Sequence, residues 1–186
     1  IPKPFKRYQL GTVWRNEKPG PGRYREFLQF DADYVGTNNL QADAELCVLI
    51  CEILERCGLD KDDYTVKISS RKFTDNLFKK LNINSDEQKT IALRALDKID
   101  RLGWNETQKL LGEGRKDKSG DYTKGANLKN DQIKIIENAL KSNEPDIEDV
   151  LEIINIFKAY NFKNYKFDPS VIRGLEYYTG PIFEVN

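Results

Sequence analysis

The sequence predicts an α+β fold, in which strand-rich segments at both ends enclose a long helical block. Polar and apolar side chains alternate over residues 26–35 and again at 165–167, a period typical of β-strands. From residue 71 to about 163, apolar side chains instead recur at helical spacing. Such an arrangement is typical of a helical insertion into a sheet domain. We therefore expect a core over residues 1–70, an insertion domain over 71–163 and a return to the core over 164–186.

The first expected elements are two strands joined by a short loop. Residues 5–14 contain the strand formers Tyr8, Val13 and Trp14, and residues 18–22 read Lys-Pro-Gly-Pro-Gly, a loop sequence. A second strand follows over Glu26–Val35. One of its faces carries Phe27, Gln29, Asp31 and Asp33, and the other carries Leu28, Phe30, Ala32 and Tyr34. We expect the apolar face to pack on a core, while the polar face is either solvated or part of a binding site.

The remaining elements follow from capping and breaking residues. A helix over 43–57 is expected to be capped by Asp43 and ended by Gly58, and Thr65–Ser69 is a short strand. The sequence Ser85-Asp-Glu-Gln88 matches a capping box and predicts a helix to Leu102, which Gly103 stops. Further expected elements are a helix near 71–81, a helix at 106–111, an exposed loop at 112–126, helices near 129–141 and 146–160, and strands at 165–167 and 181–185.

Composition bounds the class of protein. The chain has 186 residues, 39% hydrophobic and 32% charged, which is ordinary for a soluble globular protein. No apolar run approaches the roughly 20 residues of a membrane span, and no secretory signal pattern opens the chain. The three cysteines and the absence of histidine argue for a reducing, cytoplasmic setting, against a zinc site and against Ser-His or Cys-His catalysis. We expect no metal ligands from the protein, and we expect the chain to be a segment of a longer protein.

Arginines flank the first expected loop. Residues 1–30 hold seven Lys and Arg against two Asp and Glu, which favours an anionic ligand nearby. Arg15 and Glu17 share a strand face, while Arg23 and Arg25 lie beyond the loop. Such a hairpin could hold a nucleotide, with arginines on the phosphates and the Phe27 ring under the base. A plain surface ladder of ion pairs is the alternative. The chain contains neither a P-loop nor a Rossmann glycine motif.

A second candidate segment lies near the other end, Arg173-Gly-Leu-Glu-Tyr-Tyr-Thr-Gly180. Arginine offers a rigid fork of donors for a phosphate or a carboxylate. The two tyrosines offer flat walls with polar tips, and the glycines let a ligand approach the backbone. The segment is typical of a site for a small charged molecule.

These two segments together resemble a known family. Residues 7–19 and 22–36 resemble motif 2 of the class II aminoacyl-tRNA synthetases, in the form found in histidyl-tRNA synthetases, and Arg173–Gly180 resembles that family's histidine-binding signature. The resemblance implies an antiparallel β-sheet catalytic domain interrupted by a mostly helical insertion domain. It also implies the use of ATP with Mg²⁺, histidine and histidine tRNA as substrates, and a homodimer in the intact enzyme.

The resemblance also implies roles for individual residues. The catalytic pair would be Arg15 and Arg173, on opposite sides of the ATP α-phosphate. Other ATP contacts would come from Glu17, Arg23 and Phe27. The histidine pocket would be lined by Gln29, Asp33, Arg173, Tyr177 and Tyr178. Asp31 has no implied role, and Asp33 stands where many relatives carry glutamate.

The implied activity is a two-step histidine–tRNA ligation through histidyl-adenylate. Because other family motifs are absent, we expect this segment alone to be inactive. The alternative is the non-catalytic, synthetase-like subunit that regulates ATP phosphoribosyltransferase in histidine biosynthesis. That regulator tends to lose ATP-handling residues, whereas Arg15, Glu17, Arg23 and Phe27 are all present here.

Overall fold

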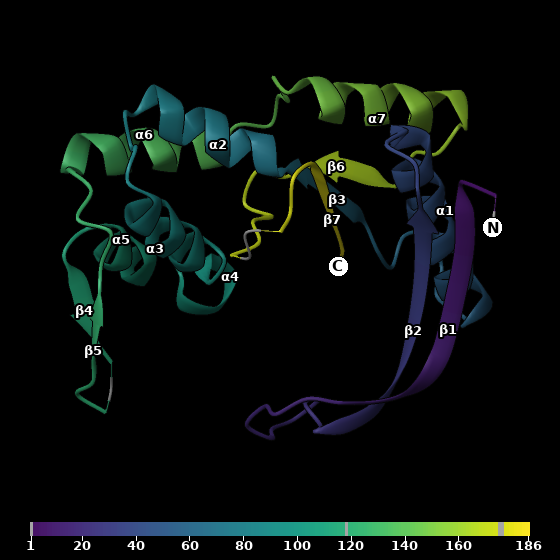
Figure 1. Cartoon of the computed structure of the whole chain (residues 1–186), viewed down its shortest axis with the longest axis horizontal. Helices are drawn as coiled ribbons and strands as arrows, with labels where there is room; N and C mark the ends of the chain where they lie inside the picture. Colours follow the sequence, from purple (N-terminus) through teal and green to yellow (C-terminus); the bar gives the residue numbers. More distant parts are fainter. Residues whose placement is uncertain (1, 118, 175–176) are drawn as a thin grey trace.

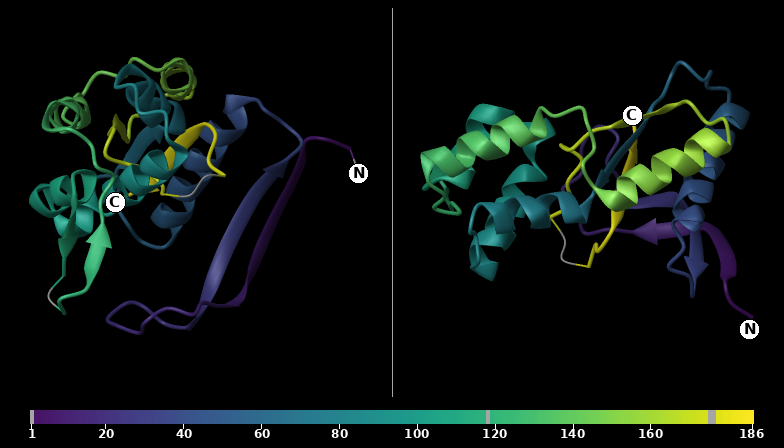
Figure 2. Two further views of the ribbon diagram at one scale, coloured as in Figure 1. Left: turned by 60° about the vertical axis from the view of Figure 1, so that its left-hand side comes forward. Right: turned by 90° about the horizontal axis from the view of Figure 1, so that it is seen from above.

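A computed structural model describes residues 2–117, 119–174 and 177–186. Its first unit is a long antiparallel hairpin of β1 (Phe5–Trp14) and β2 (Glu26–Val35), paired from Phe5 opposite Val35 to Trp14 opposite Glu26. Both strands are confirmed with the bounds that the sequence predicts. Figures 1 and 2 show this hairpin curving away from the helices, with its turn far from them.

The expected burial of the β2 faces is wrong. Leu28 is 72% exposed and Phe30 is 46% exposed, whereas Phe27 and Gln29 on the opposite face are half-buried. The exposed apolar face continues onto β1, since Leu10 lies opposite Phe30 in the register. Alternation separates two faces of a strand, but it does not decide which of them a neighbouring element covers.

A three-stranded sheet forms the centre of the molecule (Figure 1). Its middle strand β3 (Val66–Ser70) runs parallel to β6 (Tyr165–Phe167) and antiparallel to β7 (Pro181–Val185). Helix α1 (Leu40–Arg56) and helix α7 (Glu148–Ala159) pack with this sheet. The shared core is made of Ala44, Cys47, Cys51, Tyr64, Val66, Ile68, Ile147, Val150, Ile153 and Phe157.

Helix α1 begins earlier than expected. Asn39, with an extended backbone, is its N-cap, and the Asn39 side-chain oxygen accepts a hydrogen bond from the Gln41 amide at 2.9 Å. The prediction of Asp43 as the cap is therefore wrong, because the backbone is already helical there and Asp43 lies in the first turn. Asn and Asp are both favoured at an N-cap, and Asp is also favoured in the first turn, so the sequence alone does not show which residue is the cap.

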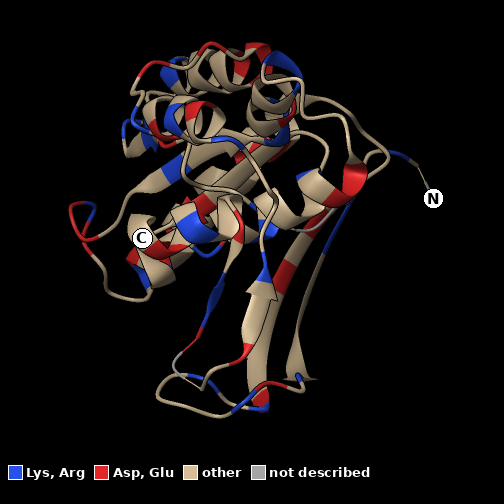
Figure 3. Cartoon of the chain, turned by 90° about the vertical axis from the view of Figure 1, so that its left-hand side faces the viewer, with Lys and Arg blue, Asp and Glu red and all other residues tan. Residues whose placement is uncertain are grey.

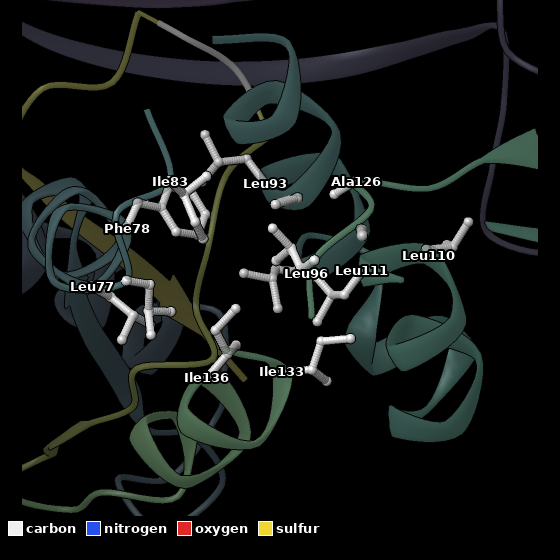
Figure 4. Close-up of a cluster of buried hydrophobic side chains, with 14 of the residues drawn as sticks. Leu77, Phe78, Ile83, Leu93, Leu96, Leu110, Leu111, Ala126, Ile133 and Ile136 are labelled. Carbon is white, nitrogen blue, oxygen red and sulfur yellow. The ribbon is translucent and has the colours of Figure 1, made fainter. Parts of the chain in front are cut away.

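A second core holds the helical block together (Figure 4). It is formed by α2 (Arg71–Lys80), α3 (Asp86–Leu96), α4 (Ile99–Leu102), α5 (Trp104–Leu111) and α6 (Asn130–Leu140). Phe78, Leu93, Leu96, Leu111 and Ile136 are almost completely buried in it. Hence α2 to α6 share one core, whereas α7 packs with α1 and the central sheet.

Two details of the helical block differ from expectation. The single helix predicted to reach Leu102 is divided into α3 and α4. Ser85 does cap α3, since its hydroxyl accepts from the Gln88 amide at 3.4 Å. In a capping box, the Gln88 side chain would bond back to the start of the helix. Here its amide nitrogen donates to the Ala126 carbonyl at 3.0 Å, which is a tertiary contact.

The segment expected to be a loop at 112–126 contains a small hairpin, so that prediction is wrong. Strand β4 (Gly114–Lys116) pairs with β5 (Tyr122–Lys124). The hairpin closes tightly at its base, where a Cβ on Gly125 would lie 2.1 Å from the Gly112 carbonyl oxygen. Glycine permits this close approach of two backbones. No helix in the described part of the chain is long and apolar enough to cross a membrane.

Candidate functional site

The polar face of the long hairpin gathers the candidate residues from its two strands. Paired residues of an antiparallel ladder point to the same side. The register therefore sets Phe27 beside Val13, Gln29 beside Gly11, and Asp33 beside Arg7 on one face. The pairing continues past β1, since the Arg15 amide donates to the Arg25 carbonyl at 2.8 Å. Arg15 thus joins the same face.

A chain of hydrogen bonds fixes the centre of this face. The Arg15 guanidinium Nη2 donates to Gln29 Oε1 at 2.7 Å, and its Cζ lies 5.1 Å from the Phe27 ring centre. Gln29 Nε2 in turn donates to both carboxylate oxygens of Asp31, at 2.9 and 3.0 Å. Asp31 thus holds the Gln29 amide with its oxygen toward Arg15. This is a structural contact for a residue to which the sequence assigned no role.

The four residues expected to contact ATP surround one hollow near the turn of the hairpin. This hollow of about 290 Å³ is lined by Arg15, Glu17, Gly22, Arg23, Tyr24 and Phe27. Glu17 Oε2 lies 3.9 Å from Arg23 Nη1, which is a loose, exposed ion pair. Figure 3 shows acidic segments along β2 and basic segments at the far turn. Arginine donors and an aromatic face in one hollow suit an anionic ligand that carries a ring.

Three of the residues expected to contact histidine line a second, larger cavity of about 870 Å³. Asp33 comes from β2, and Tyr177 and Tyr178 come from the segment before β7. The two tyrosine rings stack with centres 4.7 Å apart. Burial raises the pKa of Tyr178, and its hydrogen bond with Tyr177 adds to that increase. Asp33 also accepts from Arg7 Nε at 2.7 Å, which holds its carboxylate in place.

The same cavity has other acidic walls that the sequence did not indicate. Asp43, Asp149 and Glu152 line it, together with Lys72. Burial raises the pKa of Asp43, and the neighbouring Asp149 charge raises it further. Asp43 and Asp149 are both ordinary first-turn acidic residues of helices in the sequence, so nothing local marks them as pocket residues.

Arg173 has a different environment. Its guanidinium forms an ion pair with Glu184 of β7, in which both side chains are partly buried. Arg173 is not among the residues lining either cavity described above, and Arg15 and Arg173 have different hydrogen-bond partners. The structure therefore groups Arg15, Glu17, Arg23 and Phe27 around one hollow and Asp33, Tyr177 and Tyr178 around another. Gln29 connects to Arg15, and Arg173 sits on the central sheet. Leu175 and Glu176 of the motif lie outside the described residues.

Comparison with known proteins finds a family and relatives for this chain. A profile of the family "Histidyl-tRNA synthetase" matches residues 2–185. Histidine–tRNA ligases of Rhodopseudomonas palustris and Rhizobium meliloti are 41% and 42% identical to the chain, over 100% and 99% of it. The chain spans 43% and 41% of the lengths of these two relatives.

Solved structures show the same fold. The histidyl-tRNA synthetase of Nostoc superposes with a TM-score of 0.78 at 22% identity, covering 100% of this chain and 44% of that one. A Bacillus halodurans protein described as an ATP phosphoribosyltransferase regulatory subunit/histidyl-tRNA synthetase gives 0.70 at 20% identity, covering 99% of this chain and 48% of that one. The profile match over nearly the whole chain, and the identity to curated relatives, show that this chain belongs to the histidyl-tRNA synthetase family.

Proposed function

We propose that this chain supplies the nucleotide- and histidine-binding surfaces of a histidine–tRNA ligase. The observation that carries the proposal is the hollow at the hairpin turn, where Arg15, Glu17, Arg23 and Phe27 lie together. The phosphates of ATP would meet the arginines, and adenine would stack on Phe27 with its amino group near Glu17. Histidine would occupy the cavity between Asp33 and the tyrosines.

In the proposed first step, a carboxylate oxygen of histidine attacks the α-phosphorus of ATP. A new phosphorus–oxygen bond forms as the bond between the α-phosphorus and the α,β-bridging oxygen breaks, which yields histidyl-adenylate and pyrophosphate. Because the attacking group is already an anion, no protein nucleophile is needed, and catalysis reduces to positioning and charge stabilisation. Arg15, held by Gln29 at 2.7 Å, and Arg173, held by Glu184, would stabilise the charge on the phosphate.

In the proposed second step, a terminal ribose hydroxyl of histidine tRNA attacks the adenylate carbonyl carbon, and AMP leaves. The imidazole ring of bound histidine needs one donor and one acceptor, since its two nitrogens differ. Asp33 and a pocket tyrosine provide that pair. Polar pockets of this type reject side chains that leave their buried groups unpaired.

The remaining partners also belong to the proposal. Mg²⁺ would enter with ATP, held mainly by phosphate oxygens and water, as this ion prefers. The described residues include no cluster of three acidic or cysteine side chains that could hold a metal ion, and Glu17 is the carboxylate at the ATP hollow. We further propose histidine tRNA as the partner, a helical insertion domain within residues 71–163 whose own core is that of α2 to α6, a homodimeric intact enzyme and a cytoplasmic location.

A second candidate function is regulation of ATP phosphoribosyltransferase without catalysis. The Bacillus halodurans protein is described as a regulatory subunit of that enzyme or a histidyl-tRNA synthetase. A regulator of that kind needs a histidine pocket but no nucleotide hollow. The retention of all four residues around the hairpin hollow favours the ligase.

Titration calorimetry separates the two functions. The chain is titrated with histidine, with ATP and with a non-hydrolysable histidyl-adenylate analogue. The ligase proposal predicts that the analogue binds at least 100-fold more tightly than histidine, because it occupies both sites. If histidine binds but the analogue binds no more tightly than histidine, the result favours the regulator.

A further inference from the structure

Asp149 is a buried carboxylate that the proposed reaction does not use. It lies in the first turn of α7 and is only 3% exposed. Its Oδ1 has no hydrogen-bond partner among the described residues. A buried polar atom without a hydrogen-bond partner is costly, so its presence requires a reason.

The other oxygen of Asp149 connects α7 to the end of β3. Oδ2 accepts from the Ser70 hydroxyl at 2.9 Å and lies 3.3 Å from Lys72 Nζ. The same Ser70 hydroxyl caps α2 by accepting from the Lys72 amide at 3.2 Å. Between these two residues, the Arg71 amide donates to the Gly180 carbonyl at 2.8 Å.

Gly180 is the point at which this network reaches the tyrosine cavity. It follows Tyr178 by two residues and precedes β7. A Cβ on Gly180 would lie 3.9 Å from Asp149 Oδ2, so the backbone passes directly over the carboxylate. Asp149, Lys72, Gly180 and both tyrosines line the one cavity.

We propose that Asp149 is a positioning residue for the tyrosine segment 177–180. It fixes Ser70, Ser70 fixes the first turn of α2, and the Arg71 amide of that turn holds the Gly180 carbonyl. Asp149, the first residue in this series of contacts, belongs to α7 and lies 79 residues after Ser70 in the sequence. A displacement of α7 would therefore be transmitted to the pocket tyrosines.

Amide hydrogen exchange tests the positioning role without any substrate. We expect Asp149→Asn to accelerate exchange of the Arg71 amide about tenfold relative to the Ile136 amide, which belongs to the other core. Ser70→Ala should do the same, and the double variant should add little, because both remove one connection. Glu148→Gln removes an exposed charge from the same helical turn and should change nothing. An Arg71 amide that exchanges equally in wild type and Asp149→Asn would overturn the proposal.

A second readout rests on the proposed function. In histidine-dependent ATP–pyrophosphate exchange by the intact enzyme, Asp149→Asn should raise KM for histidine about tenfold and leave KM for ATP within about twofold. An equal rise of both KM values, or no rise for histidine, would overturn the link to the tyrosine pocket. If the intact wild-type enzyme shows no histidine-dependent exchange, the ligase assignment fails, and the hydrogen-exchange comparison still decides the role of Asp149.

Discussion

Replacement of Asp33 by asparagine separates binding from stability. Asp33 Oδ2 accepts from Arg7 Nε at 2.7 Å, and the two side chains are 44% and 56% exposed. An ion pair that is this open to water contributes at most about 1 kcal/mol to folding. Unfolding by urea should therefore show that Asp33→Asn loses less than about 1 kcal/mol.

The expected effect on histidine binding is larger. If Asp33 accepts the imidazole N–H as a charged group, that bond contributes about 1.5–3 kcal/mol. The loss corresponds to roughly 10- to 150-fold in the dissociation constant. Calorimetric titration with histidine measures it directly, on the same samples used for unfolding.

Arg7→Gln is the matched control. It breaks the same ion pair and should cost the same small amount of stability, but it leaves the Asp33 carboxylate free to bind. We expect histidine affinity to be maintained or improved. Equal weakening by both variants would show that the pair merely supports the hairpin, and unchanged affinity in Asp33→Asn would remove Asp33 from the pocket.

Three further predictions concern stability. Phe157→Ala should cost about 3–5 kcal/mol in urea unfolding, because the ring is fully buried against Phe162 and Tyr165, with centres 4.7 and 5.1 Å away; a loss below about 1 kcal/mol would contradict the central core. Gly125→Ala should cost about 1–3 kcal/mol in thermal unfolding by displacing the small hairpin, and an unchanged midpoint would contradict that close approach. Asp43 has a raised pKa, from burial first and Asp149 second, so the folded state holds its proton more tightly and stability falls as pH rises above the ordinary aspartate range. The free energy of unfolding of Asp43→Asn, relative to that of the wild type, should therefore rise between pH 3 and pH 7. A difference that does not change with pH would show that the pKa shift is absent.

The sequence predicted the long hairpin well for a physical reason. Alternating side chains on both sides of a Pro-Gly loop define two strands and their bounds without help from other elements. The same pattern could not show which face is covered, because that depends on neighbouring elements. Leu28 and Phe30, assigned to a core, are exposed in this structure.

Local capping signals were informative but ambiguous. Ser85 was identified correctly as a cap, whereas Asn39 was missed because Asp43 offers the same chemistry four residues later. The hairpin at 114–124 was missed because its short strands contain few β-forming residues. Its pairing depends on the close packing of Gly114 and Gly125 with neighbouring backbone.

The candidate site shows the same division. Arg15, Glu17, Arg23 and Phe27 lie close together along the sequence, so their grouping followed from strand and turn patterns. Asp149 meets Ser70 across 79 residues, and only the tertiary packing of α7 on the central sheet brings them together. No local pattern in the sequence marks such a contact.

Histidine-dependent exchange of pyrophosphate into ATP by the intact enzyme tests the central claim most directly, with wild type compared with Arg173→Ala and Arg173→Lys. We predict that the alanine variant loses at least about 100-fold in rate, as for other preorganised transition-state donors, and that lysine restores only part of it. An alanine variant within tenfold of wild type, or exchange that proceeds without histidine, would contradict the account.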